Sequence, residues 1–247
     1  LGDVYKREGL KVTTTIDPKA QNAAVQAACR ENKIYSCDNG VLNGEPDKIR
    51  DAVVSIDPKT GGVRGYYGGD DGQGWDYAQA GLQTGSSFKV FALIAALQQG
   101  IPLSKVYSSA PYTTSSGLTV ENSDGESCGS CNLATAMKMS LNTVYYRLMM
   151  DLDGQARAVA DAAHKAGVAE SFGDIQKTLQ NPDGQVEGGV VLGQYPSRVI
   201  DMASAYATLA ASGVYREPYL VQKVETSTGE VLYEHQQNQG QRVFPAK

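Results

Sequence analysis

The feature that most constrains the fold is an unbroken apolar run from Val90 to Leu97, within the segment TGSSFKVFALIAALQQG at 84–100. A helix that is apolar on every side is normally buried in the middle of a domain. Yet the turn that precedes this run carries Ser86 and, three residues later, Lys89. We therefore predict a buried helix whose first turn presents a serine and a lysine on the same face.

A serine and a lysine in this position form a pair with a chemical use. Unpaired N–H groups and the positive end of the helix dipole stabilise negative charge on a serine oxygen. Burial disfavours the charged ammonium and lowers its pKa, and a neutral amine beside a hydroxyl is a general base beside a nucleophile. A Ser-x-x-Lys match arises by chance about once in a few hundred residues. The spacing alone is therefore weak evidence, and the prediction depends on the position of the pair at the beginning of an apolar helix. The prediction is Ser86 as nucleophile and Lys89 as base; the alternative is a solvated lysine on a first turn.

Composition and charge exclude several classes of protein. The 247 residues are 41% hydrophobic and 20% charged, which is typical of a globular chain with a sizeable core. A net charge of -5 and a pI near 5.1 argue against a nucleic-acid partner. No run approaches the roughly 20 apolar residues that cross a membrane, so we expect no membrane contact by this segment. The abrupt beginning at Leu1 is typical of a piece cut from a longer protein.

The four cysteines form two local pairs, Cys29 with Cys37 and Cys128 with Cys131. Four cysteines allow three connectivities, and the sequence alone does not choose among them. We predict two short-range disulfides in an oxidising compartment, with unpaired thiols as the alternative. A zinc site is disfavoured, because the chain holds only two histidines to complete a ligand set around CGSC.

Other catalytic constellations find little support. A Ser-His-Asp triad has to use His164, which lies among alanines of a helical pattern, or His235, which lies in a polar tail. The chain has no Gly-x-Ser-x-Gly elbow and no glycine-rich phosphate loop with a lysine. We therefore predict neither a metal nor a cofactor.

Periodicity along the chain places strands at both ends and helices between them. The expected elements are a strand over 10–16, a helix from Pro18 capped by Asp17, a hairpin over 52–69 with its turn at 58–62, the buried helix ended by Gly100 and Pro102, helical segments from Asn132 that 140–142 interrupts, a helix closed by Gly167, a helix capped by Ser197 and ended by Gly213, and two strands over 217–235. Residues 103–131, rich in Ser, Thr and Gly, predict a long surface loop. The pattern predicts a mixed α/β fold in a single domain over 1–247, with a central, mostly antiparallel sheet covered by helices.

Two motifs resemble a known family. Ser86-Ser87-Phe88-Lys89 after Thr84-Gly85, followed by Ser140-Leu141-Asn142 within MKMSLNTVYYRL, resembles the transpeptidase domain of penicillin-binding proteins, and more closely the bifunctional class A kind. The stretches GLKVTTTIDPKAQNAA, AVVSIDPKTGGVRGYYGG, YAQAGLQTGSSFK and MASAYATLAASGVYREPYLVQKV are similar to the family in the expected order. The resemblance covers residues 9–235, and the sequence within these stretches is most similar to that of actinobacterial members.

The second motif has a decoy just upstream, because Ser130-Cys131-Asn132 also fits Ser-x-Asn. We prefer the motif at Ser140, which breaks a helical pattern and has the flanking sequence that resembles the family. The resemblance implies that Ser140 relays protons near the nucleophile and that Asn142 binds the substrate backbone.

The third family motif, Lys-Thr/Ser-Gly on an edge strand, is missing. The only similar stretch, PKTGG at 58–62, precedes the nucleophile and is interpreted as a hairpin turn. Family order places the true motif beyond residue 247. The expectation is that the C-terminal part of the domain is absent from this chain, so that either a second polypeptide completes the domain or the piece is incomplete.

The resemblance implies a D,D-transpeptidase that cross-links peptidoglycan stem peptides ending in D-Ala-D-Ala through an acyl-enzyme on Ser86. It also implies acylation by β-lactams, an extracytoplasmic location, and a parent anchored in the cytoplasmic membrane that is also a glycosyltransferase. One alternative is a D,D-carboxypeptidase or β-lactamase on the same scaffold. The only Glu-x-x-x-Asn for a deacylating glutamate is Glu234 to Asn238, in the polar tail. Another is a non-catalytic scaffold or β-lactam sensor.

Overall fold

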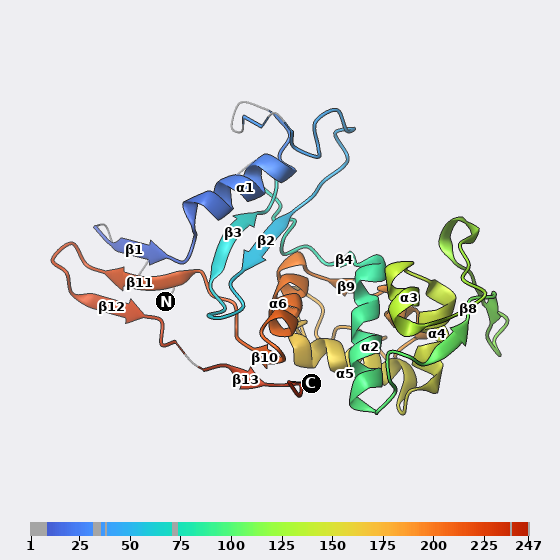
Figure 1. Ribbon diagram of the computed structural model, residues 1–247. Helices are drawn as coiled ribbons and strands as arrows, with labels where there is room; N and C mark the ends of the chain where they lie inside the picture. Colours follow the sequence, from blue (N-terminus) through green and yellow to red (C-terminus); the bar gives the residue numbers. More distant parts are fainter. Residues whose placement is uncertain (1–8, 32–35, 38, 71–73, 238, 247) are drawn as a thin grey trace. The chain divides into compact units, whose positions relative to one another are not determined.

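A computed structural model describes residues 9–31, 36–37, 39–70, 74–237 and 239–246. The chain divides into two compact units, drawn in Figure 1. The first comprises residues 1–80 and 198–247 and is called the sheet unit here. The second comprises residues 81–197 and is called the helical unit.

The sheet unit is built from antiparallel ladders covered by two helices. Its elements are β1 (Lys11–Thr14), β11 (Val221–Glu225) and β12 (Val231–Glu234) in the order β1-β11-β12, the hairpin β2 (Val53–Ile56) with β3 (Val63–Tyr67), and β10 (Val214–Tyr215) with β13 (Gln241–Arg242). Helix α1 (Pro18–Ala28) packs against β3, and α6 (Val199–Ala210) packs against β2. The predicted mixed α/β fold with antiparallel pairing is confirmed. It differs in that β2 and β3 form a separate two-stranded sheet, and the bridge from Gly62 to Tyr219 connects this hairpin to the segment just before β11.

Local signals at helix ends were correct at α1 and wrong at α6. Asp17 caps α1 as predicted, since its Oδ1 accepts hydrogen bonds from the amides of residues 19 and 20 at 3.0 and 2.9 Å. Ser197 does not cap α6. It belongs to β9 (Pro196–Ser197), and the N-cap position is Arg198, whose guanidinium binds both carboxylate oxygens of Asp201 at 2.8 and 2.7 Å. This bidentate ion pair across the first turn replaces the expected hydroxyl cap.

The strand predicted over 10–16 is present in part as β1, at the edge of its sheet. All four residues of β1 are exposed. Burial begins one residue later at Thr15, which is 5% exposed and donates its hydroxyl to the carbonyl of Val63 at 2.7 Å. The strand is therefore fixed by hydrogen bonds rather than by an apolar face.

The helical unit is centred on α2 (Lys89–Gln98), which follows the 3-10 turn η1 (Gly85–Phe88). It packs against α4 (Asn142–Asp151), α5 (Gln155–Ala166) and the 3-10 helix η3 (Gly188–Leu192). The prediction of a buried helix is confirmed for most of its length, although Leu97 at its C-terminal end is 48% exposed. The short strand β4 (Leu82–Gln83), which lies just before η1 in the sequence, pairs antiparallel with β9.

The predicted surface loop over 103–131, called the excursion loop below, contains ordered short strands. Strand β5 (Val106–Ser108) pairs with β8 (Ser130–Asn132), and β6 (Tyr112–Thr113) pairs with β7 (Thr119–Val120), with the 3-10 turn η2 (Ser123–Gly125) between β7 and β8. Helix α3 (Leu133–Lys138) then leads to α4. The excursion loop is therefore an ordered segment, held by two short antiparallel ladders, that ends at the beginning of α3.

Both predicted disulfides are present. Cys29 pairs with Cys37 in the sheet unit, and Cys128 pairs with Cys131 in the excursion loop, with Cα–Cα distances of 6.4 and 5.9 Å. Among the described residues, no helix has the length and apolar character that crossing a membrane requires.

Candidate active site

Ser86 and Lys89 lie at the junction of η1 and α2. The 3-10 turn contains Ser86, and α2 begins at Lys89, whose amide donates to the carbonyl of Ser86. The serine therefore precedes the α-helix, whereas the sequence predicted it in the first helical turn. Gly85 has φ +59, a left-handed conformation that glycine adopts without strain. The turn leaves Ser86 exposed and Lys89 fully buried.

The second motif forms the sharp connection between α3 and α4. Ser140 has φ +55 and donates its amide to Met137, and the fully buried Leu141 donates its amide to Ala136. Asn142 is the first residue of α4. The interruption of the helical pattern that the sequence showed is thus a tight turn, which the side chain of Leu141 anchors in the core.

The structure brings all four predicted site residues together around one atom, Nζ of Lys89. This nitrogen lies 2.8 Å from Oγ of Ser86 and 3.1 Å from Oγ of Ser140. It also lies 2.5 Å from the carbonyl oxygen of Ser140 and 2.6 Å from Oδ1 of Asn142. A basic nitrogen therefore connects the two hydroxyls that the sequence assigned to nucleophile and proton relay.

The environment of Lys89 favours its neutral form. Burial lowers the pKa of the Lys89 ammonium to about 8, and no carboxylate forms an ion pair with it among the described residues. Four uncharged oxygens surround Nζ. A neutral amine has a lone pair, which accepts a hydrogen bond from the hydroxyl of Ser86. The geometry thus suits removal of a proton from Ser86.

The alternatives at the sequence level lie elsewhere. Asn132 of the decoy motif caps α3 by accepting the amide of Thr135 at 2.9 Å. His164 binds the carbonyl of Val168 through Nδ1 at 3.0 Å, and His235 stacks on Tyr219 with ring centroids 3.5 Å apart. The described residues hold no group of three or more potential metal ligands. The PKTGG stretch forms the turn between β2 and β3, as interpreted from the sequence.

Sequence reasoning missed the residues that support this site. The carbonyl of Gly193, just after η3, accepts the amide of Thr84 at 3.2 Å beside the nucleophile turn. Glu121 and Asn122 of the excursion loop bind the beginning of α4. A motif search has no signal for them, because Gly193 and Glu121 act through their carbonyls, and the side chain of Asn122 meets its partners only in the folded chain.

The sequence of this chain matches a known protein family. Residues 52–247 match the family described as the penicillin binding protein transpeptidase domain. The chain belongs to this family. The transpeptidase domain is 56% identical over 229 residues to penicillin-binding protein 1A of Mycobacterium tuberculosis and to that of Mycolicibacterium smegmatis. These matches cover 92% of this chain but only 27% and 28% of the two relatives, so the chain spans about a quarter of their length.

Solved structures agree with the family assignment. The structure of the penicillin-binding protein PonA1 from Mycobacterium tuberculosis superimposes with a TM-score of 0.90 at 53% identity, covering 99% of this chain and 61% of that chain. A second PonA1 structure, in complex with penicillin V, gives a TM-score of 0.89 at 52% identity, covering all of this chain and 62% of that chain. The expected class A transpeptidase domain of the actinobacterial kind is confirmed.

Proposed function

We propose that this domain is a serine D,D-transpeptidase that cross-links peptidoglycan stem peptides and is acylated by β-lactams at Ser86. The observation that carries the proposal is the position of Lys89 Nζ, which touches the hydroxyls of both Ser86 and Ser140. The penicillin V complex of the related PonA1 supports the β-lactam part. Family membership supports the transpeptidase part, and with it an extracytoplasmic site in a membrane-anchored parent that is also a glycosyltransferase.

The proposed chemistry begins with attack by Oγ of Ser86 on the penultimate D-Ala carbonyl. Lys89 takes the hydroxyl proton, which its lowered pKa permits near neutral pH. The peptide C–N bond then breaks, and Ser140 passes a proton to the leaving nitrogen, so that the terminal D-Ala departs as an amine. The amine of a neighbouring stem peptide attacks the ester and releases Ser86. Asn142 binds the acyl chain, and the amide of Ser86 supplies one oxyanion donor.

Labelling with a fluorescent penicillin tests the assignment of the nucleophile. In the full-length protein, we expect Ser86→Ala to abolish covalent labelling while the fold remains intact, because the change removes one exposed oxygen. Ser87→Ala is the matched control: it lies in the same turn, its hydroxyl donates to the carbonyl of Thr84 at 2.8 Å, and labelling should persist. Labelling that survives in Ser86→Ala, or that maps to Ser87 or Ser130, contradicts the proposal.

Product analysis separates transpeptidation from the alternatives. With a stem pentapeptide and an amine acceptor, a transpeptidase yields a cross-linked product, whereas a carboxypeptidase yields the free tetrapeptide acid. A penicilloyl-enzyme that turns over in seconds indicates a β-lactamase, and one that persists for hours indicates a penicillin-binding protein. A protein that never acylates is a scaffold or sensor.

A further inference from the structure

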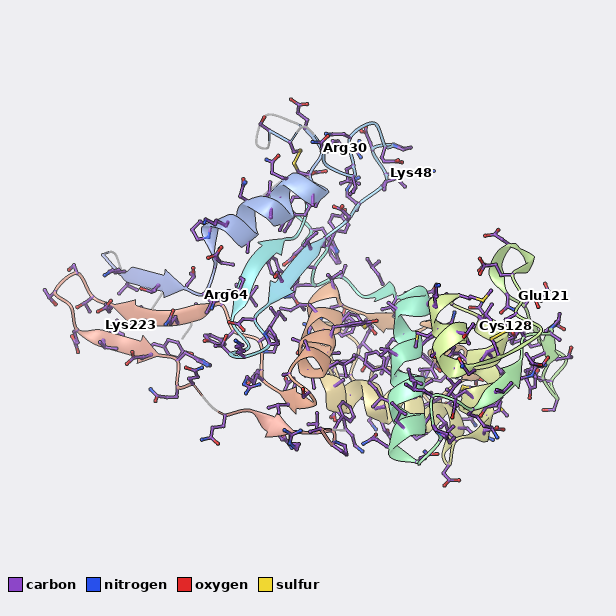
Figure 2. All side chains as sticks on the ribbon, viewed as in Figure 1. Arg30, Lys48, Arg64, Glu121, Cys128 and Lys223 are labelled. Carbon is purple, nitrogen blue, oxygen red and sulfur yellow. A yellow bond between two sulfur atoms is a disulfide. The ribbon has the colours of Figure 1, made fainter. Side chains whose placement is uncertain are left out.

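Two consecutive residues of the excursion loop, Glu121 and Asn122, hold the beginning of α4 at the residue that contacts Lys89. Nδ2 of Asn142 donates to the carbonyl of Glu121 at 3.0 Å. The amide of the next residue, Thr143, donates to Oδ1 of Asn122 at 3.0 Å. Figure 2 labels Glu121 on this loop, together with Cys128 of the disulfide further along it. The loop therefore binds both the side chain of Asn142 and the backbone directly after it.

The side chain of Asn122 is held by hydrogen bonds at both ends of its amide. Nδ2 donates to the carbonyls of Ser109 and Glu126 at 3.0 and 2.9 Å. Oδ1 accepts from the amide of Thr143 at 3.0 Å and lies 3.1 Å from Oγ1 of the same residue, whose one proton is shared with the carbonyl of Ser109 at 3.1 Å; Thr143 is fully buried. An asparagine amide offers two donors and two acceptor sites, so neither rotation nor an amide flip leaves these bonds intact. Asn122 thus links two segments of the loop, at Ser109 and at Glu126, to the first turn of α4.

This linkage sets the direction in which the amide of Asn142 points. Its nitrogen is held by the carbonyl of Glu121, so its oxygen faces Nζ of Lys89 at 2.6 Å. A rotated amide directs N–H donors at the lysine, and donors repel an ammonium. If the segment 121–122 moves away from α4, nothing else among the described contacts of Asn142 Nδ2 holds that orientation.

We propose that Asn122 is a positioning residue that keeps the amide oxygen of Asn142 on Lys89 by holding the excursion loop against α4. Its place in catalysis rests on the function proposed above, whereas its effect on Lys89 does not. Because Oδ1 of Asn142 accepts from Nζ, losing this contact disfavours the ammonium relative to the amine.

Other titratable groups near α2 do not mask this effect. The elements packed against α2 and the neighbouring loop carry these charged or titratable side chains: Tyr145, Tyr146, Arg147 and Asp151 on α4, Arg157, Asp161, His164 and Lys165 on α5, Lys138 at the end of α3, and Lys105, Tyr107, Tyr112, Glu121, Asp124 and Glu126 in the excursion loop. In the part of the chain that the structure describes, none of them forms a hydrogen bond or ion pair with Lys89. Neutral oxygens alone contact Nζ.

The test measures Lys89 directly. In full-length protein carrying ¹³C at lysine Cε, the Lys89 resonance is assigned by its absence in Lys89→Arg and titrated by NMR. For Asn122→Ala we expect the midpoint to fall by about half a pH unit or more. We also expect β-lactam acylation to slow about tenfold or more on the high-pH plateau, where Lys89 is neutral in both proteins and the rates differ only through the orientation of Asn142. The matched control is Asn43→Ala in the sheet unit, where the asparagine accepts from the amide of Glu31 at 2.8 Å and donates to the carbonyl of Cys37 at 2.6 Å. It should leave both values unchanged.

An unchanged Lys89 midpoint in Asn122→Ala overturns the proposal, even where labelling falls in proportion to the folded fraction. If Asn122→Ala does not fold, Asn122→Ser replaces it. Serine retains an acceptor for the amide of Thr143, but its single O–H cannot replace the two N–H donors that bind the carbonyls of Ser109 and Glu126. We expect an intermediate fall in the midpoint, and no fall refutes the role. A wild-type protein that is never acylated, but whose Lys89 midpoint depends on Asn122, refutes the proposed function and leaves the positioning role standing.

Discussion

The burial of Lys89 makes a quantitative prediction about the pH dependence of acylation. In the mechanism proposed above, the active form of the site has a neutral amine, so the acylation rate should follow the deprotonated fraction of Lys89 and rise with pH. With the pKa lowered to about 8, the neutral fraction is about 9% at pH 7 and about 90% at pH 9. The rate should therefore increase about tenfold between pH 7 and 9 and then level off.

A solvated lysine predicts a different curve. With a pKa of about 10.4, the neutral fraction rises from about 0.04% at pH 7 to about 4% at pH 9, an increase of about a hundredfold with no plateau. The two cases differ in slope and in shape. The curve therefore distinguishes a buried base from a lysine on an exposed first turn.

The assay is stopped-flow acylation by a fluorescent penicillin from pH 6 to 10, with the folded fraction checked at each pH. Lys89→Arg is the companion variant, because arginine retains the positive charge but does not deprotonate in a protein. We expect it to lose about a hundredfold or more in rate, like Lys89→Ala. A hundredfold rise without a plateau refutes the lowered pKa, and near-normal acylation by Lys89→Arg refutes the role of Lys89 as base.

Two further predictions concern stability and the support of the nucleophile turn. Because the pKa of Lys89 is lower in the folded chain than in the unfolded chain, its contribution to stability is unfavourable below pH 8 and improves as pH rises to about 10.5. In urea titrations, the free energy of unfolding of wild type should therefore gain about 3 kcal/mol relative to Lys89→Met between pH 7 and 10.5. A difference between the two proteins that does not change with pH contradicts the lowered pKa. Gly193 has φ +74, and a Cβ there would lie 2.5 Å from both the amide nitrogen and the carbonyl oxygen of Gly85. Gly193→Ala should therefore slow β-lactam acylation at least about tenfold. The control is Gly184→Ala, with φ +86 and open space around it, which should lose only about 1 kcal/mol of stability in thermal unfolding and acylate normally.

The parts of the fold that the sequence predicted correctly depend on short-range physics. The cap at Asp17, the stop of α5 at Gly167 and the two disulfides each involve residues within a few positions of one another. Local chemistry decides these features, because the competing conformations are few. The apolar run of α2 was informative for the same reason: a helix with so little polar surface has few places to go.

The errors arose where tertiary structure decides. Ser197 looked like a helix cap, but pairing of β9 with β4 takes the backbone of that residue, and the ion pair of Arg198 with Asp201 stabilises the first turn instead. The alternation over 10–16 predicted a strand, yet nothing in the local pattern reveals that β1 lies at a sheet edge with all four of its residues exposed. Both features depend on residues more than a hundred positions away.

The same distinction divides the candidate site. Ser86 and Lys89 were predictable because they share one turn, and Ser140 with Asn142 because a tight turn between helices has a recognisable pattern. That Ser140 and Asn142 contact Nζ of Lys89, more than fifty residues away along the chain, could be expected only from the family resemblance. Asn122 was out of reach of both, since its function comes from a loop of polar residues folding back on α4.

The choice of neutral groups around Lys89 explains why such a loop is needed. A carboxylate at the position of Asn142 would need little orientation, because either oxygen attracts the ammonium, but it would raise the pKa of Lys89 and keep the base protonated near neutral pH. An amide, a carbonyl and two hydroxyls satisfy the amine without that penalty. An amide, however, has a donor end and an acceptor end, and only one of them suits a lysine. The lowered pKa therefore requires a second group that sets the amide direction, and in this domain the carbonyl of Glu121 occupies that position.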